Sequence, residues 1–552
     1  MNTFAALLDR LGFEPSRLGK LRLMTDYFRT TPDPERGYAL AALTGALSFQ
    51  HAKSGLIRSL IGERVDPYLF DLSYDYVGDL SETVALLWPA PLQDCGSSAS
   101  NFPPLTLAEV VHALTMTGKV DLPKVMAGFL DALDETGRWA FLKLITGSLR
   151  IGASARLAKL AAAELGGKAA NEIEDIWHGL APPYLELFAW LEGRASKPEL
   201  VDPAPFRPAM LAHALDAAEL AELVAAEFCA EWKWDGIRVQ AVVGEAPHGR
   251  ITRLYSRTGE EISAAFPDLA EALVQVPHGS FSVDGELLIR REGRVQPFGV
   301  LQQRLNRKSV SAKLLRDCPA HIRAYDLLAL CGEDLRPLPF TERRRRLEDF
   351  VTEAAQPRLD LSVGISFETW DQLAAARHDP ASAGATQDAE AIEGIMLKRA
   401  DSMYVSGRPK GLWYKWKRDP FTIDAVLMYA QRGHGKRSSF YSDFTFGVWR
   451  DDGAGDTLVP VGKAYFGFTD AELRRLDRHV RDNTVNRFGP VREVSSGKDG
   501  GLVLEIAFEG LNRSPRHKSG LAMRFPRIHR IRWDKPAAEA DRVETLAALL
   551  KF

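Results

Sequence analysis

The sequence predicts a multidomain α+β protein that begins with an all-α region, continues with an α+β region and ends with a β-barrel. The first 200 residues are rich in Leu and Ala at helical spacing. Alternating polar and apolar residues, typical of strands, follow from about residue 201, and residues 419–552 contain short strands around one helix. A chain of 552 residues is long enough for about three domains. We place them at residues 1–200, 201–418 and 419–552.

Composition is that of an ordinary water-soluble protein, with 45% hydrophobic residues and a net charge of −3. This charge does not exclude nucleic-acid binding, which depends on local patches. The four cysteines are scattered without a CxxC pair, which argues against a zinc module or a disulfide framework. Asp9 and Arg10 interrupt the first apolar stretch, and no apolar run is long enough for a membrane span. We expect a cytoplasmic protein with no membrane contact.

The first 200 residues are predicted to form a bundle of short helices. Two apolar stripes at helical spacing support this: Phe4, Leu7, Leu8 and Leu11, and Leu107, Val110, Val111 and Leu114. In the segment 147–152, Gly147 and Gly152 bracket Arg150, and a helix is expected from about Ala155. Exposed amides at a helix start, together with one cation, suit a phosphate. The alternative is a plain turn between helices.

The central stretch is AEWKWDGIR, residues 230–238. If it is a strand, Glu231, Lys233 and Asp235 share one face and two tryptophans lie on the other. Burial favours the neutral form of a lysine, and a neutral amine is a nucleophile. Gly236 permits a tight bend before Arg238, a cation that suits phosphate. The alternative is a strand end with a surface ion pair.

Other pairs of charged residues two apart fall on later strands of the middle region. Asp284 and Glu286 would share a face and could hold Mg²⁺ or a ribose hydroxyl. Lys415 and Lys417 would also share a face, where they repel each other unless an anion lies between them. The run of four arginines at 343–346 falls in a predicted helix, and we expect a solvated face with no assigned role.

The last region is predicted to be an OB-fold, because about five strands with an inserted helix suit that barrel. The expected strands are 422–429, 444–449, 457–463 and 502–508, with a helix near 470–481. Near the end, the segment 524–535 contains Arg524, Arg527, Arg530, Arg532 and Lys535. This density of cations favours a polyphosphate clamp, and the alternative is a basic surface strand.

The segment KWDGIR matches KxDGxR, the nucleotidyl-lysine motif of DNA ligases, RNA ligases and mRNA capping enzymes. Segments that resemble the other superfamily motifs follow in one order: SRTG at 256–259, DGE at 284–286, RAYDLL at 323–328, EGIMLK at 393–398, the lysines at 415 and 417, and the basic segment 524–535. Residues 144–154 resemble the GELRIG-type segment of a DNA-binding domain that capping enzymes and small RNA ligases lack. The chain therefore resembles the ATP-dependent DNA ligases over nearly its whole length, most closely the bacterial type found beside an NAD-dependent replicative ligase.

The resemblance implies a role for each matching residue. It makes Lys233 the catalytic nucleophile. The residues implied in ATP binding are Glu231, Arg238, Arg257, Glu286, Tyr325, Lys415, Lys417, Arg527 and Lys535. Glu286 and Glu393 would hold metal, and Gly147, Arg150, Gly152 and Arg304 would contact DNA. The implied cofactors are ATP and Mg²⁺, with Mn²⁺ as an alternative.

The implied fold is a helical DNA-binding domain, an α+β nucleotidyltransferase (adenylation) domain and a β-barrel OB-fold domain. The implied function is sealing of nicks in duplex DNA through a lysyl-adenylate and a 5′-adenylated DNA, in DNA repair. We expect a monomer at the nucleoid, acting with other repair proteins. One alternative is an RNA ligase or a capping-type guanylyltransferase with the same lysine chemistry. Another is a non-catalytic DNA-binding protein with an inactive nucleotidyltransferase fold, against which the intact lysine and acids argue.

Overall fold

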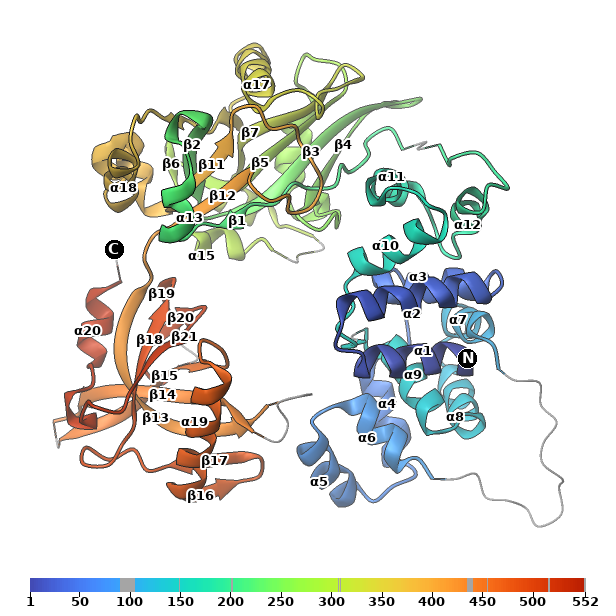
Figure 1. Ribbon diagram of the computed structural model, residues 1–552, viewed down its shortest axis with the longest axis vertical. Helices are drawn as coiled ribbons and strands as arrows, with labels where there is room; N and C mark the ends of the chain where they lie inside the picture. Colours follow the sequence, from blue (N-terminus) through green and yellow to red (C-terminus); the bar gives the residue numbers. More distant parts are fainter. Residues whose placement is uncertain are drawn as a thin grey trace. The chain divides into compact units, whose positions relative to one another are not determined.

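The computed structural model describes residues 1–89, 105–147, 149–199, 202–305, 307, 309–433, 440–453, 455–514 and 517–550. The chain forms two compact units. One contains residues 1–53 and 97–418, and the other contains residues 54–96 and 419–552. Each unit is described separately. Figure 1 colours the chain from blue at the N-terminus to red at the C-terminus.

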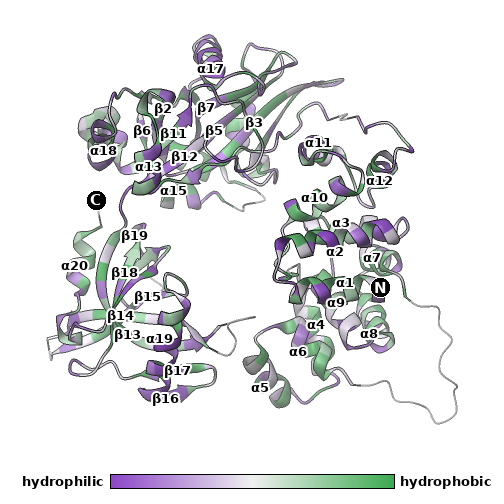
Figure 2. Cartoon of the chain, in the orientation of Figure 1, coloured by the Kyte–Doolittle hydropathy of each residue, from purple (hydrophilic) through white to green (hydrophobic). Residues whose placement is uncertain are grey.

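The N-terminal part of the first unit is helical, as predicted (Figure 1). Its α-helices are α1 (Asn2–Phe13), α2 (Arg17–Thr30), α3 (Glu35–Thr44), α7 (Leu107–Met116), α8 (Leu122–Ala132), α9 (Glu135–Thr146), α10 (Ala155–Leu165), α11 (Ala170–Ile176) and α12 (Leu185–Leu191). Both predicted apolar stripes are buried, one on α1 and one on α7. Helix α10 packs against α2 and α3, and α1 packs against α9. Figure 2 shows hydrophobic and hydrophilic stretches on the same helices, the amphipathic pattern on which the prediction depended.

Two sheets form the rest of the first unit (Figure 1). Sheet I has the strand order β1 (His213–Ala214), β12 (Trp413–Lys417), β11 (Ile392–Arg399), β2 (Phe228–Trp234) and β10 (Gly364–Ile365). Sheet II has the order β4 (Gly249–Ser256), β3 (Ile237–Ala246), β5 (Phe281–Arg291), β7 (Ala320–Leu330) and β8 (Glu333–Asp334), with β6 (Arg294–Val295) on β5 and β9 (Leu359–Leu361) on β7. The accompanying helices are α13 (Ala217–Glu222), α14 (Pro267–Val274), α15 (Phe298–Gln302), α16 (Ala312–Asp317), α17 (Phe340–Ala354) and α18 (Trp370–His378).

The two sheets meet where β2 of sheet I turns directly into β3 of sheet II. Gly236 lies in this turn, and a Cβ atom there would be 2.5 Å from the carbonyl oxygen of Leu287 on β5. Only a residue without a side chain lets the turn approach β5 so closely. The predicted alternation on β2 is confirmed, because Trp232 and Trp234 are buried in the core of sheet I. As a result, Lys233 and Arg238 are five residues apart in sequence but belong to different sheets.

The second unit contains α4 (Ser54–Gly62), α5 (Pro67–Val77) and α6 (Leu80–Leu87), together with a β-rich C-terminal part. The C-terminal elements are β13 (Phe421–Arg432), β14 (Tyr441–Asp451), β15 (Asp456–Ala464), α19 (Asp470–Asp482), β16 (Thr484–Phe488), β17 (Val491–Val494), β18 (Val503–Phe508), β19 (Gly510–Arg513), β20 (Leu521–Arg524), β21 (Arg527–Arg532) and α20 (Val543–Ala548). The four predicted strands and the predicted helix all coincide with observed ones. Strands β15, β14 and β13 pair in order, β18 pairs with β13, and β21 pairs with β18. The amide of Ile528 on β21 donates to the carbonyl of Phe466, just after β15, so the sheet curls toward closure as an OB-fold-type barrel does.

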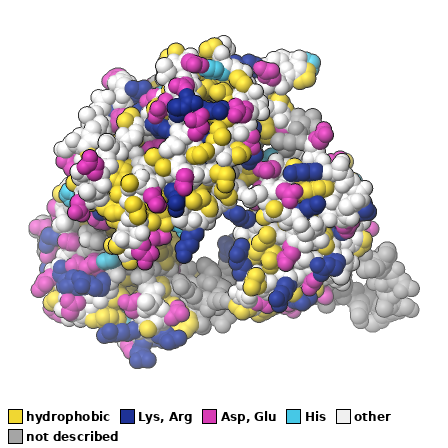
Figure 3. Space-filling model, turned by 45° about the horizontal axis from the view of Figure 1, so that its top comes forward, with side chains coloured by type: hydrophobic (Ala, Val, Ile, Leu, Met, Phe, Trp, Pro, Cys, Tyr) yellow, Lys and Arg dark blue, Asp and Glu magenta, His cyan; other side chains and the backbone are white. Residues whose placement is uncertain are grey.

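Surface charge is mixed. In Figure 3, Lys and Arg side chains lie interspersed with Asp and Glu side chains over the face shown, in keeping with the net charge of −3. Within the described ranges, every helix is too short or too polar to cross a lipid bilayer.

Candidate active site

The site is organised around Lys233 on β2. Strand β2 pairs antiparallel with β11, so that Lys233 lies opposite Gly394, and its ammonium group donates a hydrogen bond to the carboxylate of Glu393. Figure 1 shows β11 beside β2, although 160 residues separate the two side chains in sequence. A Cβ atom on Gly394 would collide with the carbonyl of Trp416 on β12. The glycine of the EGxMxK segment therefore lets the three strands pack closely behind the lysine.

The charge state of Lys233 differs from the prediction based on burial alone. Desolvation lowers its pKa, but the charges of Glu393, Glu286 and Asp235 outweigh desolvation and raise the pKa above its usual value. Its side chain is 20% exposed, so solvent still reaches the amine. Without a nucleotide, Lys233 is therefore an ammonium ion held by carboxylates, and a nucleophile forms only when that negative charge is neutralised.

Glu286 and Asp284 come from β5 of sheet II, and the structure gives them different surroundings. Burial raises the pKa of Glu286 to about 8; Lys233 opposes this shift and Glu393 adds to it. Asp284 is fully buried and accepts hydrogen bonds from Arg238, from Gln240 at 3.1 Å and from the hydroxyl of Tyr404 at 2.5 Å. Glu286 thus belongs to the lysine cluster, whereas Asp284 anchors the interior of the site.

Arg238 lies deeper than its predicted phosphate contact requires. Its guanidinium pairs with Asp284, donates to the carbonyl of Met210 and lies 2.9 Å from the hydroxyl of Tyr404. It also lies 5.8 Å from the ring centroid of Tyr325. These contacts hold the guanidinium of Arg238 among Asp284, Tyr404 and Tyr325.

Cations gather on the side of the site formed by β12. Desolvation lowers the pKa of Lys415, and the nearby charges of Arg408, Lys417, Lys233 and Arg257 lower it further. Four like charges around one ammonium group are unfavourable unless an anion binds among them. This geometry favours the phosphate role predicted for Lys415, Lys417 and Arg257. Arg408 joins the cluster and was missed, because its segment before β12 has no spacing pattern that indicates a ligand.

Tyr325, Lys398 and Glu231 form a second group of contacting side chains in the site. Tyr325 on β7 presents its ring to the ammonium group of Lys398, 4.6 Å from the ring centroid. Lys398 also contacts both carboxylate oxygens of Glu231, each at 3.3 Å. Glu231 is itself buried. Lys398 is the final lysine of the EGxMxK segment, and sequence reasoning gave it no role.

Glu286 and Glu393 remain the candidate metal ligands. Their oxygen atoms are the hard donors that Mg²⁺ prefers, and water and phosphate oxygens complete its coordination in many nucleotide sites. No group of three or more His, Cys, Asp or Glu side chains in the described part of the chain has the geometry of a metal site. Glu286 and Glu393 could thus supply two of the oxygen ligands of a metal ion that binds together with phosphate.

The predicted DNA-binding segment of the helical part has an unusual backbone. Gly147, Arg150 and Gly152 all have positive φ angles, of 71°, 50° and 65°. Arg150 is exposed, and α10 starts directly afterwards with Ser154 as its N-cap. Residue 148 of this segment is outside the described residues. An exposed arginine beside a helix start is compatible with the predicted phosphate contact.

Arg304 does not fit its predicted role in DNA binding. Its side chain is fully buried and forms a bidentate pair with Asp268 at 2.6 and 3.1 Å. It also donates to the carbonyls of Ala265 and Cys318. A guanidinium with its donors used inside the protein is not available to DNA, so we correct this assignment to a structural arginine.

The run of arginines at 343–346 is not a uniformly solvated face, contrary to expectation. The side chain of Arg343 is 0% exposed and that of Arg344 is 15% exposed. Arg345 is 61% exposed, as a solvated arginine would be. The first two members of the run therefore point into the protein.

In the second unit, the cations of the segment 524–535 have acidic neighbours. Arg527 pairs with Glu509 at 2.9 Å, and Lys535 pairs with Asp424 at 2.7 Å. Arg530 pairs with Glu505 at 3.0 Å. These side chains are thus held in place within their own unit, and an incoming polyphosphate would compete with the carboxylates.

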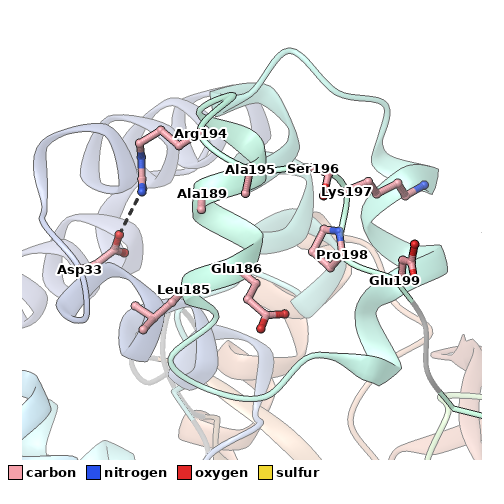
Figure 4. Close-up of a pocket in the computed structure, with 10 residues that line it drawn as sticks. All are labelled: Asp33, Leu185, Glu186, Ala189, Arg194, Ala195, Ser196, Lys197, Pro198 and Glu199. Atoms are coloured by element: carbon pink, nitrogen blue, oxygen red, sulfur yellow. Dashed lines mark ion pairs between the residues drawn. The ribbon is translucent and has the colours of Figure 1, made fainter.

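A surface hollow of about 570 Å³ lies away from this chemistry, around the end of α12 (Figure 4). Arg194 and Asp33, which form an ion pair at 3.6 Å, line it together with Leu185, Glu186 and Ala189 of α12 and the segment 195–199. It contains no residue predicted to act on a nucleotide.

Comparison with known proteins agrees with this geometry. The family model described as "ATP dependent DNA ligase domain" matches residues 209–417, and the one described as "ATP dependent DNA ligase C terminal region" matches residues 437–535. A "Probable DNA ligase" of Koribacter versatilis is 29% identical over 99% of this chain and 95% of its own length. "DNA ligase 1" of Korarchaeum cryptofilum is 28% identical over 99% of this chain and 97% of its own length. A "Probable DNA ligase" of Anaeromyxobacter dehalogenans strain 2CP-1 is 31% identical over 83% of this chain and 87% of its own length.

A similar fold occurs in the solved structure titled "Pmar-Lig_PreS3". The TM-score is 0.58 at 15% identity, with 96% of this chain and 99% of that chain covered. A helical region followed by sheets that hold a lysine among acids and cations, and then by an OB-type barrel, defines an enzyme of the nucleotidyltransferase class. The chain belongs to the ATP-dependent DNA ligase family. Membership in this family resolves the alternatives in favour of a ligase over a capping enzyme or an inactive binding protein.

Proposed function

We propose that this DNA ligase seals nicks in duplex DNA with Lys233 as its nucleophile. The observation that carries this proposal is the position of Lys233 between the carboxylates of Glu393 and Glu286 and the cations around Lys415. A reacting amine, an acceptor for its proton and a phosphate-binding surface are therefore close together. These are the groups that transfer of AMP to a lysine requires.

The reaction proceeds in three displacements. The neutral amine of Lys233 attacks the α-phosphorus of ATP, a P–N bond forms, and the bond to the bridging oxygen breaks to release pyrophosphate. A 5′-phosphate oxygen of the nick then attacks the same phosphorus, and the P–N bond breaks as Lys233 regains a proton. Finally, the 3′-hydroxyl attacks the DNA 5′-phosphate, and AMP leaves as the phosphodiester forms.

The residues of the chain control the proton on Lys233. The negative charges of Glu393 and Asp235 keep the lysine protonated, and Glu286 adds to this effect once the pH exceeds its own pKa of about 8. A bound Mg²⁺, or Mn²⁺ in its place, would supply positive charge beside Glu286 and Glu393 and so favour the neutral amine. Lys415, Lys417 and Arg257 would hold the phosphates in line with Lys233, and Tyr325 and Glu231 would contact the base.

The remaining roles follow the predicted domains. Residues 1–200 would bind the duplex through Gly147, Arg150 and Gly152, and residues 201–418 would carry out adenylation. Residues 419–552 would bring Arg527 and Lys535 to the departing pyrophosphate. We expect a monomer that acts at the nucleoid in the cytoplasm, in DNA repair. Other repair proteins would deliver the nick.

Labelling with nucleotide tests the proposal. Wild-type protein incubated with α-labelled ATP and Mg²⁺ should keep an acid-labile label on a denaturing gel, whereas GTP should give little. Lys233→Ala should abolish the label, and Lys313→Ala, at an exposed lysine with no predicted role, should retain it. Nicked duplex DNA should be sealed, and nicked duplex RNA should not. A label that survives in Lys233→Ala would place the covalent bond on another residue.

A further inference from the structure

The four consecutive arginines of α17 do not share one face of the helix. An α-helix turns about 100° per residue, so neighbouring side chains point in different directions. The side chain of Arg344 is 15% exposed, whereas that of Arg345 is 61% exposed. Helix α17 lies against β7, the strand that carries Tyr325 (Figure 1). The inward arginines therefore reach the nucleotide site from behind.

Arg343 holds the strand that carries Tyr325. It forms a bidentate pair with Asp326, the residue after Tyr325, at 2.8 and 2.9 Å. The third guanidinium nitrogen of Arg343, Nη1, donates to the carbonyls of Leu338 and Ser402. Both partners of the pair are fully buried. The fork of Arg343 thus fixes β7 at the point where the aromatic ring faces the site.

Arg344 holds Glu231 together with Lys398. It donates to the carboxylate of Glu231 at 3.2 Å and to the carbonyl of Ser362 at 2.6 Å. Lys398 contacts the same carboxylate and donates to the carbonyl of Tyr325 at 3.0 Å. The side chain of Glu231 is 5% exposed, so its carboxylate can accept about one more hydrogen bond, from a ligand. A carboxylate bonded to two cations offers only acceptor atoms to that partner.

The position of Glu231 points to the base and not to the phosphates of a nucleotide. A carboxylate repels a triphosphate, and the cations that suit phosphate lie on β12 and around Lys233. Lys398 instead joins Glu231 to the ring of Tyr325. Adenine presents an amino donor at its sixth position, where guanine presents a carbonyl acceptor. A rigid acceptor at this position accepts the first base and repels the second.

We propose that Arg344, acting with Lys398, is a positioning residue that sets the preference for ATP over GTP by fixing the carboxylate of Glu231 at the base end of the site. This inference deepens the proposed function and rests on it. Arg343 secures the neighbouring wall of the same pocket through Asp326. Sites that oblige a base to donate a hydrogen bond discriminate strongly, because the wrong base leaves a buried polar group unpaired.

The test compares Arg344→Gln with Arg345→Gln, two changes of the same kind one residue apart on α17. Single-turnover adenylation is measured over a range of ATP and of GTP concentrations, and thermal melting checks folding. In Arg344→Gln, half-maximal adenylation should need about tenfold more ATP at a nearly unchanged maximal rate, and the ATP-to-GTP preference should fall about tenfold. Arg345→Gln should match wild type, since its partners Glu342 and Asp349 belong to the same helix.

A double-mutant cycle separates positioning from a general structural effect. Glu231→Gln replaces a pure acceptor with a group that also donates, so it should lose the preference by itself. Adding Arg344→Gln to Glu231→Gln should then change the preference little further. Arg344→Lys keeps the charge and should retain part of the preference. If Arg344→Gln does not fold, Arg344→Lys is compared with wild type in its place.

The outcomes distinguish this inference from the proposed function. If wild-type protein forms no adduct on Lys233, the proposed function fails before base preference is measured. If the adduct forms but Arg344→Gln, or Arg344→Lys in its place, keeps the wild-type ATP-to-GTP ratio, the positioning role is overturned. A fall in maximal rate with an unchanged ratio would also overturn it, because a loosened scaffold would affect both nucleotides equally.

Discussion

The ammonium group of Lys233 donates a hydrogen bond to Glu393, and the same carboxylate lies 3.7 Å from Lys417. One acid therefore faces both the nucleophile and a phosphate-binding lysine. We expect Glu393→Gln to lower the pKa of Lys233, because removal of the negative charge favours the neutral amine.

The pKa of Lys233 should be lower in Glu393→Gln than in wild type, both measured without metal or nucleotide. Competitive acylation over a pH series, read by mass spectrometry, reports the midpoint for Lys233, and Lys313 in the same sample serves as the reference. An unchanged midpoint would show that Glu393 does not control the charge of the lysine.

Glu286 should make the stability of the metal-free protein depend on pH. Its pKa is about 8 in the folded protein, against an ordinary value of 4.5. Because the folded protein holds the proton of Glu286 more tightly than the unfolded chain does, protonated Glu286 contributes to stability. This contribution is complete below pH 4.5 and is lost as the pH rises through about 8. Glu286→Gln, which cannot ionise, should therefore gain stability over wild type as the pH rises.

The melting temperature of Glu286→Gln should exceed that of wild type by about 2–4 °C more at pH 8.5 than at pH 5.5. Glu368→Gln, a change at an exposed acid of the same unit, should show no such trend. A difference for Glu286→Gln that is constant with pH would mean that the side chain is ionised throughout.

Arg150→Ala tests the helical segment. Loss of one phosphate contact should weaken binding of nicked duplex and reduce the slope of log affinity against log salt by about one. Fluorescence anisotropy at several salt concentrations measures both quantities, and Arg29→Ala, at an exposed arginine paired with Asp26, is the control. Self-adenylation should be unaffected. Normal DNA affinity together with lost adenylation would sink the assignment.

Arg527→Ala combined with Lys535→Ala tests the clamp. If these cations stabilise the departing pyrophosphate, adenylation by ATP should fall about 100-fold or more. Sealing of a nick that already carries a 5′-adenylate should persist, because only AMP leaves in that step. Arg542→Ala, which removes a pair with Asp456 outside the segment, is the control. An equal fall in both reactions would assign the segment a general structural role.

Arg304→Met tests whether Arg304 stabilises the fold rather than binds DNA. Removing one partner of a buried ion pair leaves Asp268 with Arg358 and the backbone amide of Ala320, which should cost about 3–5 kcal/mol of stability. Protein that remains folded at low temperature should bind nicked DNA with wild-type affinity. Weaker binding without any loss of stability would falsify the structural assignment and restore the predicted DNA contact.

Local patterns predicted the elements well because their physical causes are local. The stripe of Phe4, Leu7, Leu8 and Leu11 requires only that one side of a helix be buried. The alternation around Lys233 requires only the two-residue period of a strand. The spacing of Lys415 and Lys417 likewise predicted repulsion between them. Desolvation and Arg408 lower the pKa of Lys415 most, and Lys417 lowers it further.

Local patterns did not predict features that depend on contacts between residues far apart in the sequence. Burial alone predicted a neutral Lys233, but acids from β5 and β11 reverse the direction of the shift. Arg304 has a basic sequence context typical of a surface turn, but its side chain is buried in an ion pair with Asp268. The arginines of α17 carry no signal that distinguishes Arg344 from Arg345, because their partners lie on other elements.

Periodicity and side-chain chemistry are properties of the chain, so the sequence predicts which elements form and which residue types can perform nucleotidyl transfer. The charge on Lys233, the burial of Arg304 and the contact between Arg344 and Glu231 depend on the tertiary structure. Each of these depends on groups brought close from distant parts of the sequence, and electrostatic energy is set by distance and burial rather than by order along the chain.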